Sequence, residues 1–215
     1  LEGREPRFGT ANPERIDLPF WHAMVRCGWN AYRAARQFGD SSIFRDRPVW
    51  CHDRFGMSLT RLPDGRFVQV AGEHEDHYDP DFCIYNDVIV HDGEGGVTIY
   101  GYPRQVFPPT DFHSATLVDE WIYLIGSLGY PEDRVPEGPT PVFRLHTGSF
   151  AIEKVTTDGP SPGWIHDHQA TFENGLIVIR GGKQLIEDDD GEHDIVPRTG
   201  THRFDPARAH WEEES

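Results

Sequence analysis

The sequence has too little cysteine and too little positive charge for several common classes of protein. Its three cysteines, Cys27, Cys51 and Cys83, stand far apart and form no Cys-x-x-Cys pair, so they predict neither a zinc knuckle nor a disulfide framework. Lys and Arg number 20 against 36 Asp and Glu, which gives a formal net charge of −16. A field of that sign repels phosphate backbones and anionic lipid. We therefore expect no nucleic-acid partner and no membrane partner.

Long hydrophobic runs and the short motifs of common enzymes are also missing. No apolar stretch approaches the roughly 20 residues that span a bilayer, and no basic-then-apolar leader opens the chain, which favours a cytoplasmic location. The sequence contains no Gly-x-Ser-x-Gly elbow, P-loop, dinucleotide fingerprint or His-Glu-x-x-His. Ser, His and Asp are common, but their spacing selects no triad, so no catalytic residue is predicted.

Glycine and proline, in contrast, are plentiful and spread along the chain, with 22 and 17 residues. This distribution suits many short strands joined by turns better than long helices. Apolar segments that end in glycine recur at a fixed interval, because Gly72, Gly126 and Gly181 are 54 and 55 residues apart. A fixed period of this size indicates repeats of one all-β unit. The segments are Phe67–Gly72, Trp121–Gly126 and Leu176–Gly181.

Each repeat contains four predicted strands. The first precedes the glycine-ending strand across a tight turn, at Ser58–Leu62, His113–Leu117 and His168–Phe172. The third and fourth strands follow it, at Val88–Gly93 with Val97–Tyr100, Val142–Gly148 with Phe150–Ile152, and His202–Pro206 with His210–Trp211. Extra residues in the third repeat are assigned to an acidic loop from Gly191 to Gly200. The sequence thus predicts full units at about 53–108, 109–163 and 164–215, and a half unit at 42–52.

These repeats resemble the kelch family, whose blades carry a Gly-Gly pair after an aliphatic strand and a Trp in the fourth strand. Gly181-Gly182 keeps the pair, Trp211 matches the Trp, and Arg54–Ser58 and Phe112–Ala115 match the residues that open a blade. Two departures are Glu73 and Ser127, which replace the second glycine of the pair. The resemblance implies an all-β, kelch-like β-propeller or partial propeller of four-stranded antiparallel blades, with binding loops on the two faces of the disc.

Three and a half blades are fewer than the four to eight that close a propeller. Either the natural chain continues, or another subunit supplies the missing edge, or the N-terminal segment 1–41 covers it. One helix is predicted in that segment, from Phe20 to about Phe38, with Pro19 in its first turn and Gly39 after its last. We expect this helix to cover an exposed sheet edge rather than to bind a partner.

Histidines recur where the first strand of a repeat begins. His113 and His168 share one register, and His52 and His166 lie within a few residues of such openings. Imidazole binds zinc, copper and iron, so convergent histidines would form a site for a divalent transition metal. The alternative, which we favour, is that His113 and His168 form hydrogen bonds between blades, as histidines at this position do in kelch repeats.

A second polar cluster, from Glu73 to Asp81, holds two histidines among five carboxylates. Together with the histidines above, it gives the candidate metal ligands, which are His52, His74, His77, His113 and His168. Other residues near the face loops offer forked donors, a ring or a carboxylate to a ligand. The candidate ligand-binding residues are Arg54, Tyr78, Arg104, Asp111, His113 and His168.

The predicted function is a binding module that holds a protein or a small polar ligand through its face loops. The alternative is a metal-assisted or sugar-processing enzyme with a histidine-rich site at the mouth of the channel. A third hypothesis is self-association through an unpaired blade edge.

Overall fold

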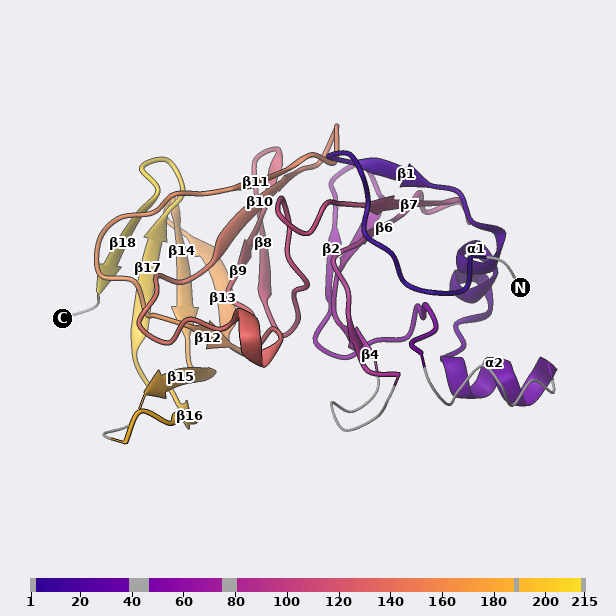
Figure 1. Ribbon diagram of the computed structural model, residues 1–215. Coiled ribbons are helices and arrows are strands. Elements are labelled where there is room, and N and C mark those ends of the chain that lie inside the picture. The colour runs from indigo at the N-terminus through magenta and orange to yellow at the C-terminus, as the bar shows by residue number, and fades with distance from the viewer. Residues whose placement is uncertain (1–2, 39–46, 75–80, 188–189, 214–215) are drawn as a thin grey trace.

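A computed structural model describes residues 3–38, 47–74, 81–187 and 190–213. Its main elements are three antiparallel sheets that follow one another along the chain (Figure 1). The first has the order β1-β7-β6-β3-β2. Its strands are β1 (Glu14–Ile16), β2 (Ser58–Arg61), β3 (Phe67–Val70), β6 (Val88–His91) and β7 (Val97–Gly101). The last four are the strands predicted for the first repeat, whereas β1 was not predicted and extends the outer edge by pairing Ile16 with Ile99.

The second and third sheets each contain the four strands predicted for their repeat. The second has the order β11-β10-β9-β8 and the third β13-β14-β17-β18. Their strands are β8 (Ser114–Val118), β9 (Trp121–Ile125), β10 (Val142–His146), β11 (Ile152–Lys154), β13 (Gln169–Glu173), β14 (Leu176–Arg180), β17 (Thr201–Asp205) and β18 (His210–Glu213). β8 contacts both β2 and β13, so the first strands of the three repeats lie side by side. The predicted antiparallel all-β architecture is confirmed.

Two smaller sheets lie beside the three main sheets. One pairs β4 (Glu73–His74) with β5 (Cys83–Ile84), and the other has the order β12-β15-β16. The latter contains β12 (Ile165–His166), β15 (Lys183–Glu187) and β16 (His193–Pro197). The prediction of an acidic loop from Gly191 to Gly200 was therefore wrong for most of its length. β16 pairs with β15 along its length, from Lys183 with Pro197 to Glu187 with His193, and Leu185 of β15 is buried.

The single helix predicted from Phe20 to Phe38 is two helices, α1 (Pro19–Cys27) and α2 (Ala31–Phe38). Gly28 ends α1 in the left-handed conformation, with φ 60°, and its N–H donates to the Met24 carbonyl at 3.0 Å. The predicted position at a sheet edge was also wrong. Trp21 and its neighbours on α1 pack with Ile89 and Ile99 against a face of the first sheet. Neither helix is long and apolar enough to cross a membrane.

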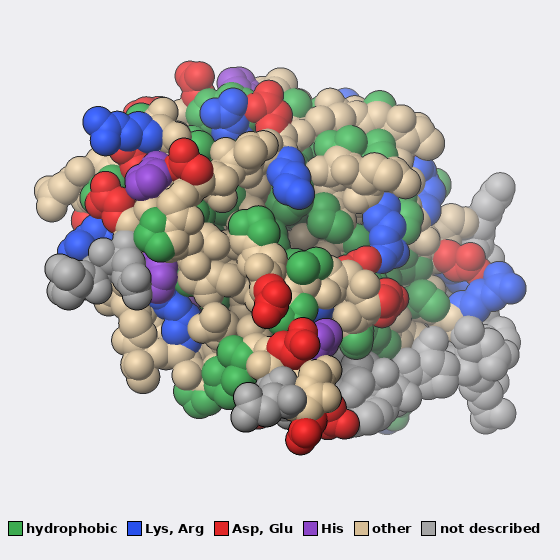
Figure 2. Space-filling model, turned by 60° about the vertical axis from the view of Figure 1, so that its left-hand side comes forward, with side chains coloured by type: hydrophobic (Ala, Val, Ile, Leu, Met, Phe, Trp, Pro, Cys, Tyr) green, Lys and Arg blue, Asp and Glu red, His purple; other side chains and the backbone are tan. Residues whose placement is uncertain are grey.

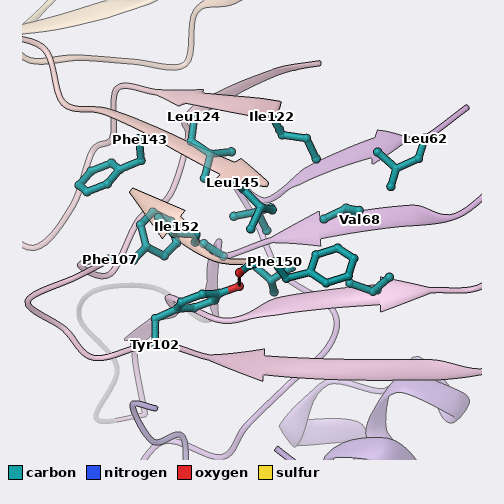
Figure 3. Close-up of a cluster of buried hydrophobic side chains, with 14 residues drawn as sticks. Leu62, Val68, Tyr102, Phe107, Ile122, Leu124, Phe143, Leu145, Phe150 and Ile152 are labelled. Carbon is teal, nitrogen blue, oxygen red and sulfur yellow. Dashed lines mark hydrogen bonds between the residues drawn. The ribbon is translucent and has the colours of Figure 1, made fainter. Parts of the chain in front are cut away.

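Hydrophobic side chains join neighbouring sheets face to face. Figure 3 shows Val68 of the first sheet near Ile122, Leu124 and Leu145 of the second. The Tyr102 hydroxyl donates to the Phe150 carbonyl at 2.7 Å across the same junction. The second and third sheets pack in the same way through another cluster, which contains Val118, Tyr123, Ile125, Val142, Ile165, Ile177, Ile179, Phe204 and Trp211. Burial of these side chains stabilises each junction by removing apolar surface from water.

Candidate functional site

The histidines that open the strands of the second and third repeats bond to the preceding repeat. His113 Nε2 lies 2.8 Å from Ser58 Oγ, and His168 Nε2 lies 2.8 Å from Ser114 Oγ. The expected hydrogen bond between neighbouring repeats is thus confirmed for both. Burial lowers the pKa of His113 to about 4 and that of His168 to about 3, so both imidazoles are neutral at pH 7 and hold the sheets together.

The candidate metal ligands that the structure describes do not form a metal site. His52 packs edge-on against His91 at a ring separation of 5.8 Å, and His74 is buried in β4. Within the described ranges, no group of three or more His, Cys, Asp or Glu could hold a metal ion. His77, like the candidate ligand-binding residue Tyr78, lies outside the described residues. Among the residues described, the geometry gives the metal hypothesis no support.

Arg54 was predicted to bind a ligand, but its side chain is buried inside the first repeat. Its guanidinium pairs with Asp87, donates to the Cys51 carbonyl at 2.7 Å and to the Ala71 carbonyl at 3.1 Å. It also lies 3.6 Å from the centre of the Tyr85 ring. Because the side chain is fully covered by protein, Arg54 supports the fold and cannot reach a ligand.

Arg104 is partly exposed and pairs with an acidic residue of the second repeat. Its Nη2 lies 2.6 Å from Asp133 Oδ2. The same ion pair lies beside a smaller cavity of about 290 Å³ that Tyr130 and Arg104 both line. This guanidinium is therefore accessible but already has a carboxylate partner.

Three residues with left-handed backbone mark equivalent points of the three repeats. Gly56, Phe112 and Asp167 have φ values of 60°, 47° and 56°. The Phe112 N–H donates to the Gly56 carbonyl at 2.7 Å, and the Asp167 N–H donates to the Phe112 carbonyl at 2.8 Å. A Cβ on Gly56 would lie 2.6 Å from the Phe112 nitrogen, which explains glycine there. These hydrogen bonds connect the three repeats at one end of the molecule.

A cavity of about 730 Å³ opens beside these residues. Phenylalanine rings contribute to its wall, and Phe55 is 66% exposed. Its position is fixed because the Phe55 and Glu73 backbones exchange two hydrogen bonds of 2.9 Å. The lining is formed by Phe55, Glu73, Phe82, Ile84, Asp111, Phe112, Leu128, Gly129, Pro131, Arg134 and Ile195. Hereafter we call this space the inter-repeat cavity, since its lining comes from all three repeats.

Asp111, a predicted ligand-binding residue, is fully buried at this cavity. Its Oδ1 accepts hydrogen bonds from the Gly129 N–H at 2.7 Å and the Ser127 hydroxyl at 3.2 Å. No N–H or hydroxyl donor of the described residues reaches its Oδ2. The carboxyl group of Glu73, from the first repeat, forms a hydrogen bond with Asp111. Two carboxyl groups can form a hydrogen bond only when one carries a proton.

Burial also changes the proton affinity of this pair. It raises the pKa of Asp111, while the hydrogen bonds from Gly129, Glu73 and Ser127 and the charge of Arg134 act in the opposite direction. The effect of burial on the pKa is the larger one, because the carboxyl group is inaccessible to water and faces a second acid. The pair is therefore suited to sharing one proton.

Arg134 is the one basic side chain among the described residues that line the inter-repeat cavity. Its Nε donates to the Leu128 carbonyl at 3.0 Å, and its Nη2 donates to the Gly129 carbonyl at 3.0 Å. Partial burial lowers its pKa, against the attraction of Asp111, Glu132 and Glu73. The side chain thus holds the 128–134 loop in place. Its described hydrogen bonds go to backbone carbonyls, and it acts on the two acids through its charge.

Figure 2 shows one face of the molecule, on which acidic, basic and hydrophobic side chains lie interspersed. Asp111 differs from such surface acids because it is fully buried.

The sequence identified Asp111 but not its partners. Glu73 and Ser127 occupy the equivalent position in the first two repeats, where Gly182 stands in the third. Both of these departures from the repeat contact Asp111. A polar residue at a position that the repeat fills with glycine was therefore the available signal for this site.

Replacing Asp111 by Asn should stabilise the protein more at pH 7.5 than at pH 4.5. A carboxyl whose pKa is raised by folding contributes stability below its unfolded pKa and loses it as the pH rises through the folded value. Asn keeps an oxygen for Gly129 and Ser127 and adds a donor toward Glu73. Urea unfolding of the parent and Asp111→Asn at several pH values measures the difference, which we expect to grow by about 1 kcal/mol or more as the pH rises. If the difference in unfolding free energy shrinks as the pH rises, burial does not raise the pKa of Asp111.

The comparisons with known proteins identify no relative, since no protein-family model and no curated protein matches the chain. The chemistry of the inter-repeat cavity therefore has to be judged from its own residues. Its floor can accept hydrogen bonds or a positive charge, its walls can stack on an apolar group, and its acid pair can take up or release a proton.

Proposed function

We propose that the chain is a kelch-like partial propeller that acts as a binding module, and that it holds a small polar ligand in the inter-repeat cavity. Support for the propeller comes from an equivalent four-strand unit that is present in each of the three main sheets, with the first strands of the units side by side. The hydrogen bonds of His113 and His168 join consecutive sheets in the same manner at both junctions. Such an arrangement leaves the loops at its two ends for binding.

One observation carries the ligand proposal, namely a buried carboxyl group that is bonded to a second acid at the floor of an open, aromatic-walled cavity. No N–H or hydroxyl of the described residues donates to Asp111 Oδ2, so the hydrogen bond to Glu73 depends on a proton held between two acids, and a ligand N–H or O–H would supply a permanent donor there. The volume, about 730 Å³, lies in the range of small-molecule sites. Phe55 and Phe112 supply apolar contact beside the polar floor.

The test is loss of binding when the exposed ring is removed from the cavity wall. Phe55→Ala should lower the affinity of the inter-repeat cavity for its ligand by about tenfold. A stacked ring contributes roughly 1 kcal/mol of binding free energy in addition to that from the apolar area it buries. Ligands are found by thermal shift over a panel that contains cations, anions and neutral polyols, and affinities are then measured by calorimetry.

Phe172→Ala is the matched control for this experiment. Phe172 is 46% exposed on β13 and does not line the cavity, so its loss removes a comparable ring without touching the proposed site. Equal weakening by the two variants, or a panel with no Phe55-dependent member, would refute the proposal.

An enzyme remains the second candidate, with the acid pair rather than the histidines at its centre. Asp111 and Glu73 have the arrangement in which one acid donates a proton and the other accepts one. Such a pair can give a proton to one atom of a bound ligand while it takes a proton from another. Turnover of a bound ligand, absent in a binding module, distinguishes the two functions.

A further inference from the structure

We propose that the ligand of the inter-repeat cavity is an organic cation, whose ammonium group lies between the carboxyl groups of Asp111 and Glu73 while its apolar part packs on Phe55 and Phe112. This inference rests on the proposed function and specifies the class of ligand. The argument uses the balance of charges in the cavity, the donors that remain unassigned and the nature of the walls.

Among the described residues of the lining, the charged groups are two acids and one base. Glu73 and Asp111 come from different repeats and meet at the floor, and Arg134 faces both. When the acid pair holds one proton the lining is neutral, and when both acids are ionised it carries one net negative charge. A bound ammonium group would supply the missing positive charge and allow both acids to ionise.

Donors also point to a cation rather than to an anion. The described hydrogen bonds of Arg134 go to the carbonyls of Leu128 and Gly129, so the guanidinium is oriented by the loop and not presented as a fork to a ligand carboxylate. Asp111, in contrast, forms a hydrogen bond with another acid, Glu73, and no N–H or hydroxyl donor of the described residues reaches its Oδ2. The polar group that the floor lacks is a donor, and an ammonium provides three.

The walls suit the remainder of such a ligand. Phenylalanine faces attract cations and cover alkyl or aromatic groups, and Phe55, Phe82 and Phe112 surround the floor. The net charge of −16 adds a long-range field that favours the approach of cations over anions. Field, walls and floor therefore select the same chemical class.

Binding of a cation in this way displaces the shared proton. The charge of Arg134 acts on both acids of the pair, and Glu132 acts on Arg134. The imidazole of His166 packs edge-on against Phe112, with Lys183 and Asp167 as its charged neighbours. Burial lowers the pKa of His166 to about 4, so at pH 7 it is neutral and the released proton comes from the acid pair.

The probes are benzylammonium and its neutral counterpart benzyl alcohol, with methyl glucoside as a polyol. Calorimetry at pH 7 in two buffers of different ionisation enthalpy gives both the affinity and the number of protons released. We expect benzylammonium to bind at least tenfold more tightly than benzyl alcohol and to release a measurable fraction of a proton. Asp111→Asn and Glu73→Gln should each weaken benzylammonium by about ten- to a hundredfold and remove the proton release, whereas Phe172→Ala should retain both.

Each outcome has a definite meaning. Tighter binding of benzyl alcohol or methyl glucoside at a Phe55-dependent site would overturn the cation inference and leave the binding function in place. Benzylammonium binding that survives Asp111→Asn unchanged would also overturn the inference. If no probe of any charge binds in a Phe55-dependent manner, the proposed function itself fails. Urea unfolding of each variant confirms that weakened binding does not reflect unfolded protein.

Discussion

Asp87→Ala should lower the free energy of unfolding by about 3 to 5 kcal/mol, the effect expected when one partner of a buried ion pair is removed. The variant leaves the Arg54 guanidinium, which is fully covered, without its counter-charge. It also removes the acceptor of the Trp50 indole N–H, now 2.6 Å from Asp87 Oδ2. Urea unfolding at pH 7 measures the loss, which should place Asp87→Ala among the most damaging single changes in the first repeat.

Asp133→Ala provides the matched control. It breaks the 2.6 Å contact between Asp133 and Arg104, whose side chains are 33% and 40% exposed, respectively. Ion pairs this exposed contribute up to about 1 kcal/mol to stability. Replacing both Arg54 and Asp87 by apolar residues of similar size should recover much of the loss, because the unpaired charge is then gone. Equal effects of Asp87→Ala and Asp133→Ala would show that burial does not govern the Arg54–Asp87 pair.

The second large effect is a steep loss of stability as the pH falls below 6.5. Burial lowers the pKa of His113 and His166 to about 4 and that of His168 to about 3. Below the ordinary value of 6.5 the unfolded chain binds protons that the folded chain does not, so stability falls with pH until the folded values are reached. At pH 5 this amounts to about 2 kcal/mol for each histidine.

Unfolding free energies at pH 7.0, 6.0 and 5.0 test this expectation. His113→Gln should lower stability at pH 7.0, because it disturbs the bond to Ser58, and should also flatten the dependence on pH. His193→Gln, which removes an exposed imidazole on β16, should retain the slope of the parent. A parent protein equally stable at pH 7.0 and 5.0 would contradict the assignment of these histidines as buried and neutral.

The four strands of each repeat were predictable because their signals are local. Alternating apolar residues, tight turns and glycines at a constant period lie within a few residues of each strand, and tertiary packing did not override them. The break between the helices was less visible, since Gly28 stands inside an otherwise periodic apolar face. The pairing of β1 with β7 joins segments more than eighty residues apart, and no short-range pattern encodes such a contact.

The site was only partly predictable, for the same reason. Asp111 was identified near a blade opening, but its partners Glu73 and Ser127 come from two different repeats. Arg54 was expected at a ligand because a forked donor near a loop suggests one, and Asp87, 33 residues away, takes that donor instead. Departures from a repeat were the more informative signal, because positions freed from the repeated structure can serve a site.

Phe112 occupies a position with a further consequence. Its backbone donates to the first repeat and accepts from the third, while its ring lines the inter-repeat cavity. A ligand held against that ring would contact the residue that connects all three repeats. Ligand binding in the cavity and the stability of the contacts between repeats would therefore be thermodynamically linked. In a chain of modules that contact only their neighbours, this would make the whole molecule unfold more cooperatively when the cavity is filled, with no sheet changing its shape.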